Sequence, residues 1–479
     1  MSKLYRALVV TLISVVSFAA GRTNQSSNSP SLRNVSGTEI VHYKDGPVPV
    51  DLSTTTIAAL IPNGSSYTVI SGSGTSSGNF SIANVPSGFY LLQIGNVYLW
   101  TNKTIVDADS DSGTRSGKVQ ADQNTTLTFD LTNLSAWQSN DFFEFVCPNN
   151  AAFQAFSQYT DGATTFAGTY RYYGALSDAS KGDQYYMVQL ITQNVGGFPF
   201  TALGRYIAPP KFTQPQGSDT PINGKLRTIA QTHSFEANIS GADLTAQTLA
   251  ANPNAVMTDT TIYLDAHPGS LAKGQGTSTP DLVGYNFGTG LPFITSNGDL
   301  GPVLYGNPFP SSKWPLFGGY AYAASTLYTA PGATNGAYIG SFVQDDTTTL
   351  PTSKNPMKPL VGVVTNPSIN GKKFFQDHTG VGFTPLLKWS PPAVGTATYY
   401  DLQVIQLSNN GGNTVKTRIA DLYTQRTSMR VPSGLLSTGL GYVFRIRPFY
   451  DPGVNFAKTP FMFGPTTAVA DVLSGMMQP

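Results

Sequence analysis

The sequence has one cysteine, few charged residues and very little glutamate. Cys147 is the only cysteine among 479 residues, so an intrachain disulfide is excluded. Charged residues make up 11% of the chain, whereas an average soluble protein has about 25%. Glutamate occurs only at Glu39, Glu144 and Glu236. Periodic Ala/Glu/Lys/Leu stretches are nearly absent, so we expect strands and turns rather than long helices.

A long hydrophobic run is also missing. The apolar stretch of residues 7–20 is shorter than the roughly 20 residues that a membrane-spanning helix needs. Lys3 and Arg6 precede it, and small residues follow it up to Gly21, which is the pattern of a secretory signal peptide. We therefore expect residues 1–21 to be a cleaved signal. The mature protein is expected to be secreted, at the cell surface or in the periplasm, with no transmembrane segment.

The charge balance excludes one class of partner. The chain has 28 basic and 27 acidic residues, and without the signal peptide it is close to neutral. We therefore expect no nucleic-acid partner. A single cysteine in an exported chain of this length favours a bacterial source. The polar residues 22–34 have no apolar periodicity and are expected to form a flexible linker.

The first module is predicted around a hairpin. Residues 79–82 and 89–94 read as two strands joined by the turn Pro86-Ser87-Gly88, in which proline fixes φ and glycine accepts a positive φ. The run from Gly78 to Leu92 resembles the end of the carboxypeptidase regulatory-like, or transthyretin-like, domain. This resemblance implies a β-sandwich over residues 35–132, and the alternation of apolar residues predicts its last strand at 125–131.

The remaining chain is predicted to form two more β-rich domains. Residues 136–353 are predicted to hold many strands, with turn signals about ten residues apart and one helix expected at 242–251. Residues 358–473 contain Trp389, Tyr442, Phe444 and Ile446 in a pattern that resembles the fibronectin type III domain over 375–470. The resemblance implies that Trp389 and Tyr442 fill the core from two opposite sheets. The fold class is therefore all-β, with several β-sandwiches.

An aromatic cluster in the central region is the predicted ligand-binding surface. Prolines at 308, 310 and 315 favour a stiff loop over residues 299–315. Aromatic rings on a rigid β-framework can stack on sugars or fill a partner's pocket. The alternative is that Phe309 and Trp314 close the end of the core. The predicted ligand-binding residues are Tyr305, Phe309, Trp314, Tyr320 and Tyr322.

Other motifs give weaker indications of chemistry. Asp107, Asp109 and Asp111 alternate as oxygen ligands do in calcium loops, although no EF-hand is formed. A structural calcium ion is the one cofactor that the sequence suggests. Residues 74–78 match a nucleophile elbow but precede a strand, so we interpret them as a turn. The four histidines, at 42, 233, 267 and 378, are isolated from one another and are expected to be solvated or structural.

These patterns favour a protein without enzymatic activity. Both resembled families serve as spacers and interaction modules, which implies a binding, adhesion or scaffold protein for a glycan or a surface protein. The alternative is a secreted, glycan-active hydrolase with its active site in residues 136–353. That alternative predicts a group of carboxylates or a histidine-centred cluster there.

Overall fold

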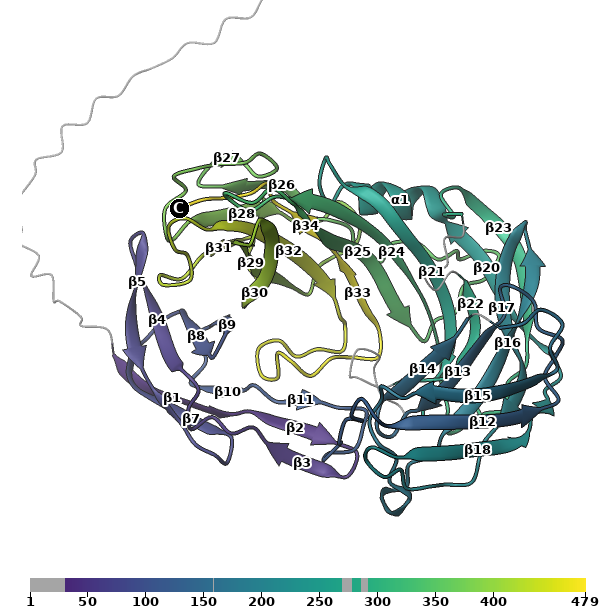
Figure 1. The fold of residues 1–479 in the computed structure, drawn as a ribbon. Helices are drawn as coiled ribbons and strands as arrows, with labels where there is room; N and C mark the ends of the chain where they lie inside the picture. Colours follow the sequence, from purple (N-terminus) through teal and green to yellow (C-terminus); the bar gives the residue numbers. More distant parts are fainter. Residues whose placement is uncertain (1–30, 158, 269–277, 286–291) are drawn as a thin grey trace, which may run out of the picture.

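The computed structural model describes residues 31–157, 159–268, 278–285 and 292–479 (Figure 1). These residues form 34 β-strands, one α-helix and one short 3-10 helix. The strands belong to six sheets, of which the largest has 18 strands. The predicted all-β fold class is therefore confirmed. In the described part of the chain, no helix has the length and apolar character needed to cross a membrane.

The N-terminal unit, residues 31–111, contains strands from three sheets. The first sheet has the order β10-β1-β7-β6, and the second has the order β11-β2-β3. Their bounds are β1 Leu32–Thr38, β2 Ile40–Tyr43, β3 Gly46–Pro49, β6 Ser73–Gly74, β7 Asn79–Pro86, β10 Ile105–Asp107 and β11 Ser110–Asp111. The strands β4 Ile57–Asn63, β5 Ser66–Ser71, β8 Tyr90–Ile94 and β9 Val97–Thr101 are part of the 18-stranded sheet.

The predicted hairpin is wrong, although both of its strands exist. β7 pairs with β1 and β6, whereas β8 pairs with β4 and β9. Gly88 has φ 117°, as the turn prediction required. The turn therefore carries the chain from one sheet to another. Because Val85 and Tyr90 on either side are both fully buried, the sequence motif reflects core packing between sheets rather than strand pairing.

The N-terminal unit is continuous with the C-terminal end of the chain. β9 pairs in parallel with β30 (Asn413–Thr424), and Tyr98 lies opposite Leu422. Tyr98 and Leu422 also belong to one hydrophobic cluster that includes Leu91 and Trp389. The first and last parts of the chain thus share both a sheet and a core (Figure 1).

The central part of the chain contains most of the long strands. β12 (Thr126–Thr132) pairs with β15 (Thr165–Arg171) and β18 (Asp219–Lys225). The sequence placed this strand at the end of the first sandwich, but its hydrogen-bonding partners both lie in the central region. Apolar residues of β12 pack inward against an aromatic cluster that includes Phe145 and Phe166.

The large sheet supplies the other central strands. Their bounds are β13 Phe142–Cys147, β14 Ala152–Phe156, β16 Tyr186–Val195, β17 Phe198–Ile207, β19 Arg227–Thr228, β21 Val256–Ala266, β22 Asp281–Tyr285, β24 Leu316–Tyr328 and β25 Ala337–Thr347. A separate pair is formed by β20 His233–Ser240 and β23 Asn297–Tyr305. The predicted helix is present as α1, Gly241–Leu249, and η1 spans Ala179–Lys181. The predicted loop at 299–315 is wrong in its first half, because β23 continues to Tyr305 before the prolines end it.

The C-terminal unit, residues 365–479, contains a small sheet and the end of the large one. The strands are β26 Thr365–Ile369, β27 Lys372–Lys373, β28 Leu386–Ser390, β29 Tyr399–Asn410, β31 Ser428–Arg430, β32 Gly441–Tyr450, β33 Thr467–Ala470 and β34 Val472–Leu473. Trp389 on β28 and Tyr442 on β32 meet in one buried cluster from different sheets, as expected. Val443 is buried on the other face of β32, so both faces of this strand are covered.

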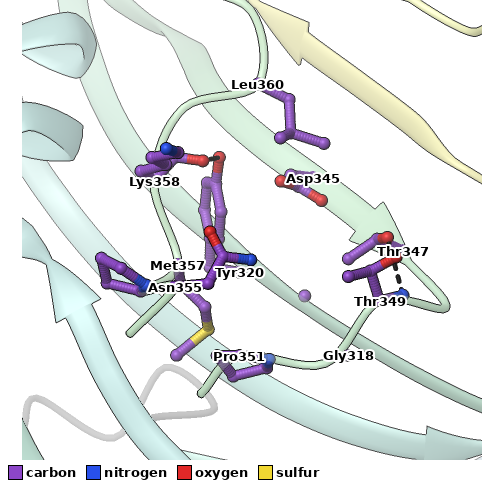
Figure 2. A pocket seen from close by; sticks show the side chains of 12 residues that line it. Gly318, Tyr320, Asp345, Thr347, Thr349, Pro351, Asn355, Met357, Lys358 and Leu360 are labelled. Carbon is purple, nitrogen blue, oxygen red and sulfur yellow. Dashed lines mark hydrogen bonds between the residues drawn. The ribbon is translucent and has the colours of Figure 1, made fainter. Parts of the chain in front are cut away.

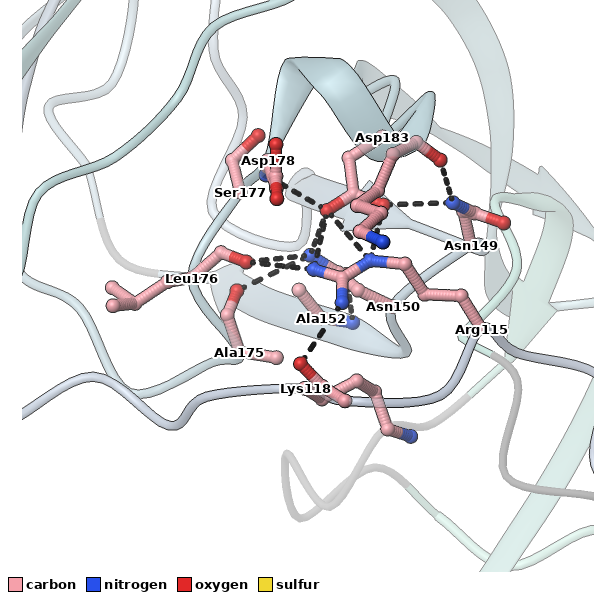
Figure 3. Close-up of polar contacts among 12 residues, drawn as sticks. Arg115, Lys118, Asn149, Asn150, Ala152, Ala175, Leu176, Ser177, Asp178 and Asp183 are labelled. Carbon is pink, nitrogen blue, oxygen red and sulfur yellow. Dashed lines mark hydrogen bonds and ion pairs between the residues drawn. The ribbon is translucent and has the colours of Figure 1, made fainter. Parts of the chain in front are cut away.

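A buried ion pair fixes the segment that leaves the N-terminal unit. Figure 3 shows Arg115 facing Asp183, with the guanidinium Nε 3.0 Å from Oδ1 and Nη2 2.9 Å from Oδ2. Asn149 and Asn150 also donate to this carboxylate. The Asp183 side chain is fully buried, so these hydrogen bonds replace the water that a buried carboxylate loses. The contact attaches the segment after β11 to the central part of the chain.

Candidate functional site: a basic and aromatic cleft between the chain ends

The predicted aromatic residues lie in the core of the central region. Tyr305, Phe309, Tyr320 and Tyr322 are each at most 5% exposed, and Trp314 packs half-buried against the same cluster. The Phe309 and Trp314 rings are 4.6 Å apart, and both meet Tyr186 edge-on. The structure thus agrees with the alternative in which these rings fill the core, and it leaves no exposed aromatic platform at this position.

Tyr320 also lines a small cavity beside Asp345. Figure 2 shows Tyr320 pointing to the segment at Lys358, whose carbonyl oxygen accepts a 2.9 Å hydrogen bond from the phenol. Burial, together with the neighbouring Asp346, raises the pKa of Asp345 to about 8. The cavity has a volume of about 80 Å³, below the roughly 300 Å³ at which ligand pockets begin. It has the size of a water site rather than of a site for an organic ligand.

The three predicted calcium ligands are not brought together. Asp109 accepts hydrogen bonds from the Thr38 hydroxyl and the Ile40 amide, both at 2.9 Å, and its other oxygen lies 3.3 Å from His42 Nε2. Asp107 and Asp111 lie in β10 and β11, opposite Thr38 and His42. Among the described residues, no group of three His, Cys, Asp or Glu side chains could hold a metal ion. Asp109 instead holds the turn between β1 and β2.

The remaining histidines and the elbow-like motif have structural surroundings. His233 stacks on Tyr305 and His267 packs on Phe317, whereas His378 Nε2 donates to the Lys373 carbonyl at 2.8 Å. Residues 74–78 form a turn before β7, closed by the Gly78 amide and the Thr75 carbonyl at 3.1 Å. No helix follows this turn, so it lacks the geometry of a nucleophile elbow.

Buried carboxyl groups gather on three strands of the central region. Glu144 on β13 accepts a 3.0 Å hydrogen bond from the Asp281 amide on β22. Asp265 on β21 lies 3.8 Å from His267 Nε2. Burial raises the pKa of Glu144 to about 7, and burial with the adjacent Glu144 raises that of Asp281 well above its ordinary value. Glu144 is fully buried and Asp265 and His267 are at most 3% exposed, whereas Asp281 is half-buried.

An open cleft lies where the N-terminal and C-terminal units meet. Its floor is one face of the β28–β31 pair, in which Leu386 lies opposite Arg430 and Lys388 opposite Ser428. The alternate residues Leu387 and Met429 are buried in the core on the inner side. The two-residue period of the strands thus puts two cations on the face that lines the cleft.

The N-terminal unit supplies the aromatic wall of this cleft. Tyr67 on β5 and Trp100 on β9 line it. The Tyr67 hydroxyl donates to the Arg430 carbonyl at 3.0 Å, and the Thr384 hydroxyl donates to the Ser65 carbonyl at 2.8 Å. Burial raises the pKa of Tyr67 to about 12, so the phenol stays protonated and continues to donate. These bonds hold the two walls at a fixed separation.

The position of Arg426 beside Trp100 follows from the register of the parallel pair β9–β30, which joins the N-terminal and C-terminal units. Since Tyr423 on β30 lies opposite Leu99 on β9, the turn after β30 runs past Trp100. The Arg426 guanidinium carbon is 5.0 Å from the centre of the Trp100 ring, which also stacks on Phe89. The cleft has a volume of about 410 Å³, within the range of roughly 300–1,000 Å³ for ligand pockets. No protein-family model matches this chain, and no curated protein is detectably similar to it.

Sequence reasoning missed this cleft. The only local indication is Trp100, which alternates with the buried Leu99 and therefore points away from the core of the N-terminal unit. Arg426 and Arg430 lie far from Trp100 in the sequence. They approach it because β9 and β30 pair in parallel, and no local sequence pattern predicts that pair.

Proposed function

We propose that this protein is a secreted or cell-surface binding protein without catalytic activity, and that the cleft described above binds a glycan. The observation that carries this proposal is the combination of a 410 Å³ cleft, the aromatic side chains Tyr67 and Trp100, and cations that are available to a ligand. Aromatic rings with adjacent polar donors fix the orientation of small ligands in pockets. The signal-like N-terminus and the two resembled interaction modules also support the proposal.

A glycan-binding screen tests the proposal. The mature chain, residues 22–479, is applied to an array of neutral and acidic oligosaccharides, with Trp100→Ala as the test variant. The control is Tyr173→Ala, because Tyr173 in the central region is an exposed ring that, like Trp100, has an arginine over it, with Arg171 4.8 Å from its centre. Binding that Trp100→Ala abolishes and Tyr173→Ala retains supports the proposal. Binding that neither variant changes contradicts the assignment to this cleft.

A glycan-active hydrolase is the second candidate, and the cluster of the carboxyl groups of Glu144, Asp265 and Asp281 favours it. Neighbouring carboxyl groups with raised pKa values are used as acids in glycoside hydrolysis. Release of reducing ends from glycans by the wild-type protein, lost in Glu144→Gln, would support this candidate. If the protein only binds glycans, we expect no such release, because Glu144 is fully buried.

A further inference from the structure

We infer that the ligand of the cleft is an anionic saccharide, with Arg426 as the residue that binds its acidic group. This inference rests on the glycan-binding function proposed above and names the chemical class of the ligand. The cleft is lined by Lys388, Arg426 and Arg430, and no acidic side chain appears among its described lining residues. The rest of the chain is nearly neutral, so this is a local concentration of positive charge.

None of these three cations is neutralised within the described part of the chain. Arg430 donates to the Thr384 carbonyl at 2.8 Å, which leaves its charge uncompensated. Lys388 and Arg426 make no side-chain hydrogen bond or ion pair there. By contrast, the buried Arg115 and the half-buried Arg447 each pair with an aspartate. The cations of the cleft are therefore available to a ligand of opposite charge.

The guanidinium of Arg426 is already oriented before such a ligand binds. This guanidinium lies against Trp100, and Trp100 is fixed in turn by β9 and by stacking on Phe89. A contact with the ring face restrains the guanidinium plane and leaves its N–H edge free for a planar carboxylate or a sulfate. Because the group is already oriented, less conformational entropy is lost on binding.

The shape of the cleft favours a saccharide over a small free anion. A lone carboxylate or phosphate would fill only a small part of 410 Å³. Tyr67 and Trp100 supply apolar surface next to the cations, and Ser428 adds a hydroxyl on the floor. A sugar ring bearing a carboxylate or a sulfate matches this combination, with its apolar face against Tyr67 and its acidic group on Arg426, which lies over Trp100.

The experiment compares acidic and neutral oligosaccharides with an acidic polymer that is not a saccharide. Binding of the mature chain is measured by calorimetry with oligogalacturonate, a sulfated oligosaccharide, a neutral cello-oligosaccharide of equal length and poly-glutamate. We expect an acidic oligosaccharide to bind, with affinity that falls as salt is added. The neutral oligosaccharide is expected to bind at least roughly tenfold more weakly. The carboxylated and sulfated arms identify which acidic group is recognised.

Arg426→Gln is the test variant, and Arg171→Gln is the matched control because it removes a similar exposed arginine beside Tyr173. We expect Arg426→Gln to weaken binding of the acidic oligosaccharide by roughly 10- to 100-fold and to leave the melting temperature of the protein unchanged. If the neutral oligosaccharide binds equally well and Arg426→Gln has no effect, the anionic class is wrong while glycan binding stands. Stronger binding of poly-glutamate would overturn the saccharide assignment, and no binding of any ligand would overturn both proposals.

Discussion

Tyr98 and Leu422 lie opposite each other in adjacent parallel strands, although one is near the beginning of the chain and the other near its end. Both side chains are buried in a single cluster with residues of the C-terminal unit. The N-terminal and C-terminal units therefore form one folding unit with a common core, and the cleft lies where they meet.

Truncating Leu422 should destabilise both ends together. Leu422→Ala removes a fully buried side chain and is expected to lower the free energy of unfolding by about 2–5 kcal/mol. Val415→Ala on the same strand, where the side chain is 39% exposed, should change it by less than about 0.5 kcal/mol. Denaturant unfolding followed by tryptophan fluorescence measures both. If Leu422→Ala left the N-terminal unit unaffected in hydrogen exchange, the two ends would not be coupled.

Stability should fall as the pH rises through neutrality. The pKa of Glu144 is raised to about 7 in the folded protein, from about 4.5 in the unfolded chain, so the folded state retains a proton that the unfolded state releases. This contribution is complete below pH 4.5 and is lost as the pH rises through 7, on the order of 3 kcal/mol. Asp281 and Asp345, whose pKa values are also raised, act in the same direction.

The variant Glu144→Gln isolates this effect. Glutamine can still accept from the Asp281 amide but does not titrate, so the free energy of unfolding should depend less on pH between 5 and 8. Glu236→Gln on β20, a half-buried glutamate outside the carboxyl group cluster, is the control. An unchanged pH profile for Glu144→Gln would show that the buried carboxyl is ionised in the folded state.

Breaking the Arg115–Asp183 pair should be costly. Arg115→Ala leaves the fully buried Asp183 carboxylate without its cation, and we expect a loss of about 3–5 kcal/mol. Arg171→Ala at an exposed arginine should cost less than about 1 kcal/mol. The double variant Arg115→Met with Asp183→Asn removes both charges and should recover part of the loss. Equal melting temperatures for Arg115→Ala and wild type would contradict a stabilising role for the pair.

Calcium should have little effect on stability. Both oxygens of Asp109 are already engaged by Thr38, Ile40 and His42, so a bound ion would have to break these contacts. We expect the melting temperature to be the same in calcium and in chelator. A rise with calcium that is lost in Asp109→Ala would restore the calcium site that the sequence suggested.

The sequence predicted local patterns better than the partners of each strand. Trp389 and Tyr442 were placed in the core correctly, because alternation along a strand is a local property. The strand at residues 126–132 was found but assigned to the wrong neighbours, since pairing depends on distant segments. The sequence pattern predicts a binding surface at Tyr320 and Tyr322, whereas both rings are buried and their phenols donate to the carbonyl oxygens of Lys358 and Ile294.

The pairing of β9 with β30 also sets an order of events in folding. The N-terminal unit is synthesised first, and the β9 edge that β30 later occupies has no partner until the chain has been made past Thr424. An open strand edge is a site for pairing with other chains, and closing so long a loop slows folding. Truncated or slowly synthesised chains of this protein would therefore expose the unpaired edge of β9. Expression of residues 22–131 alone should yield aggregates rather than a folded domain.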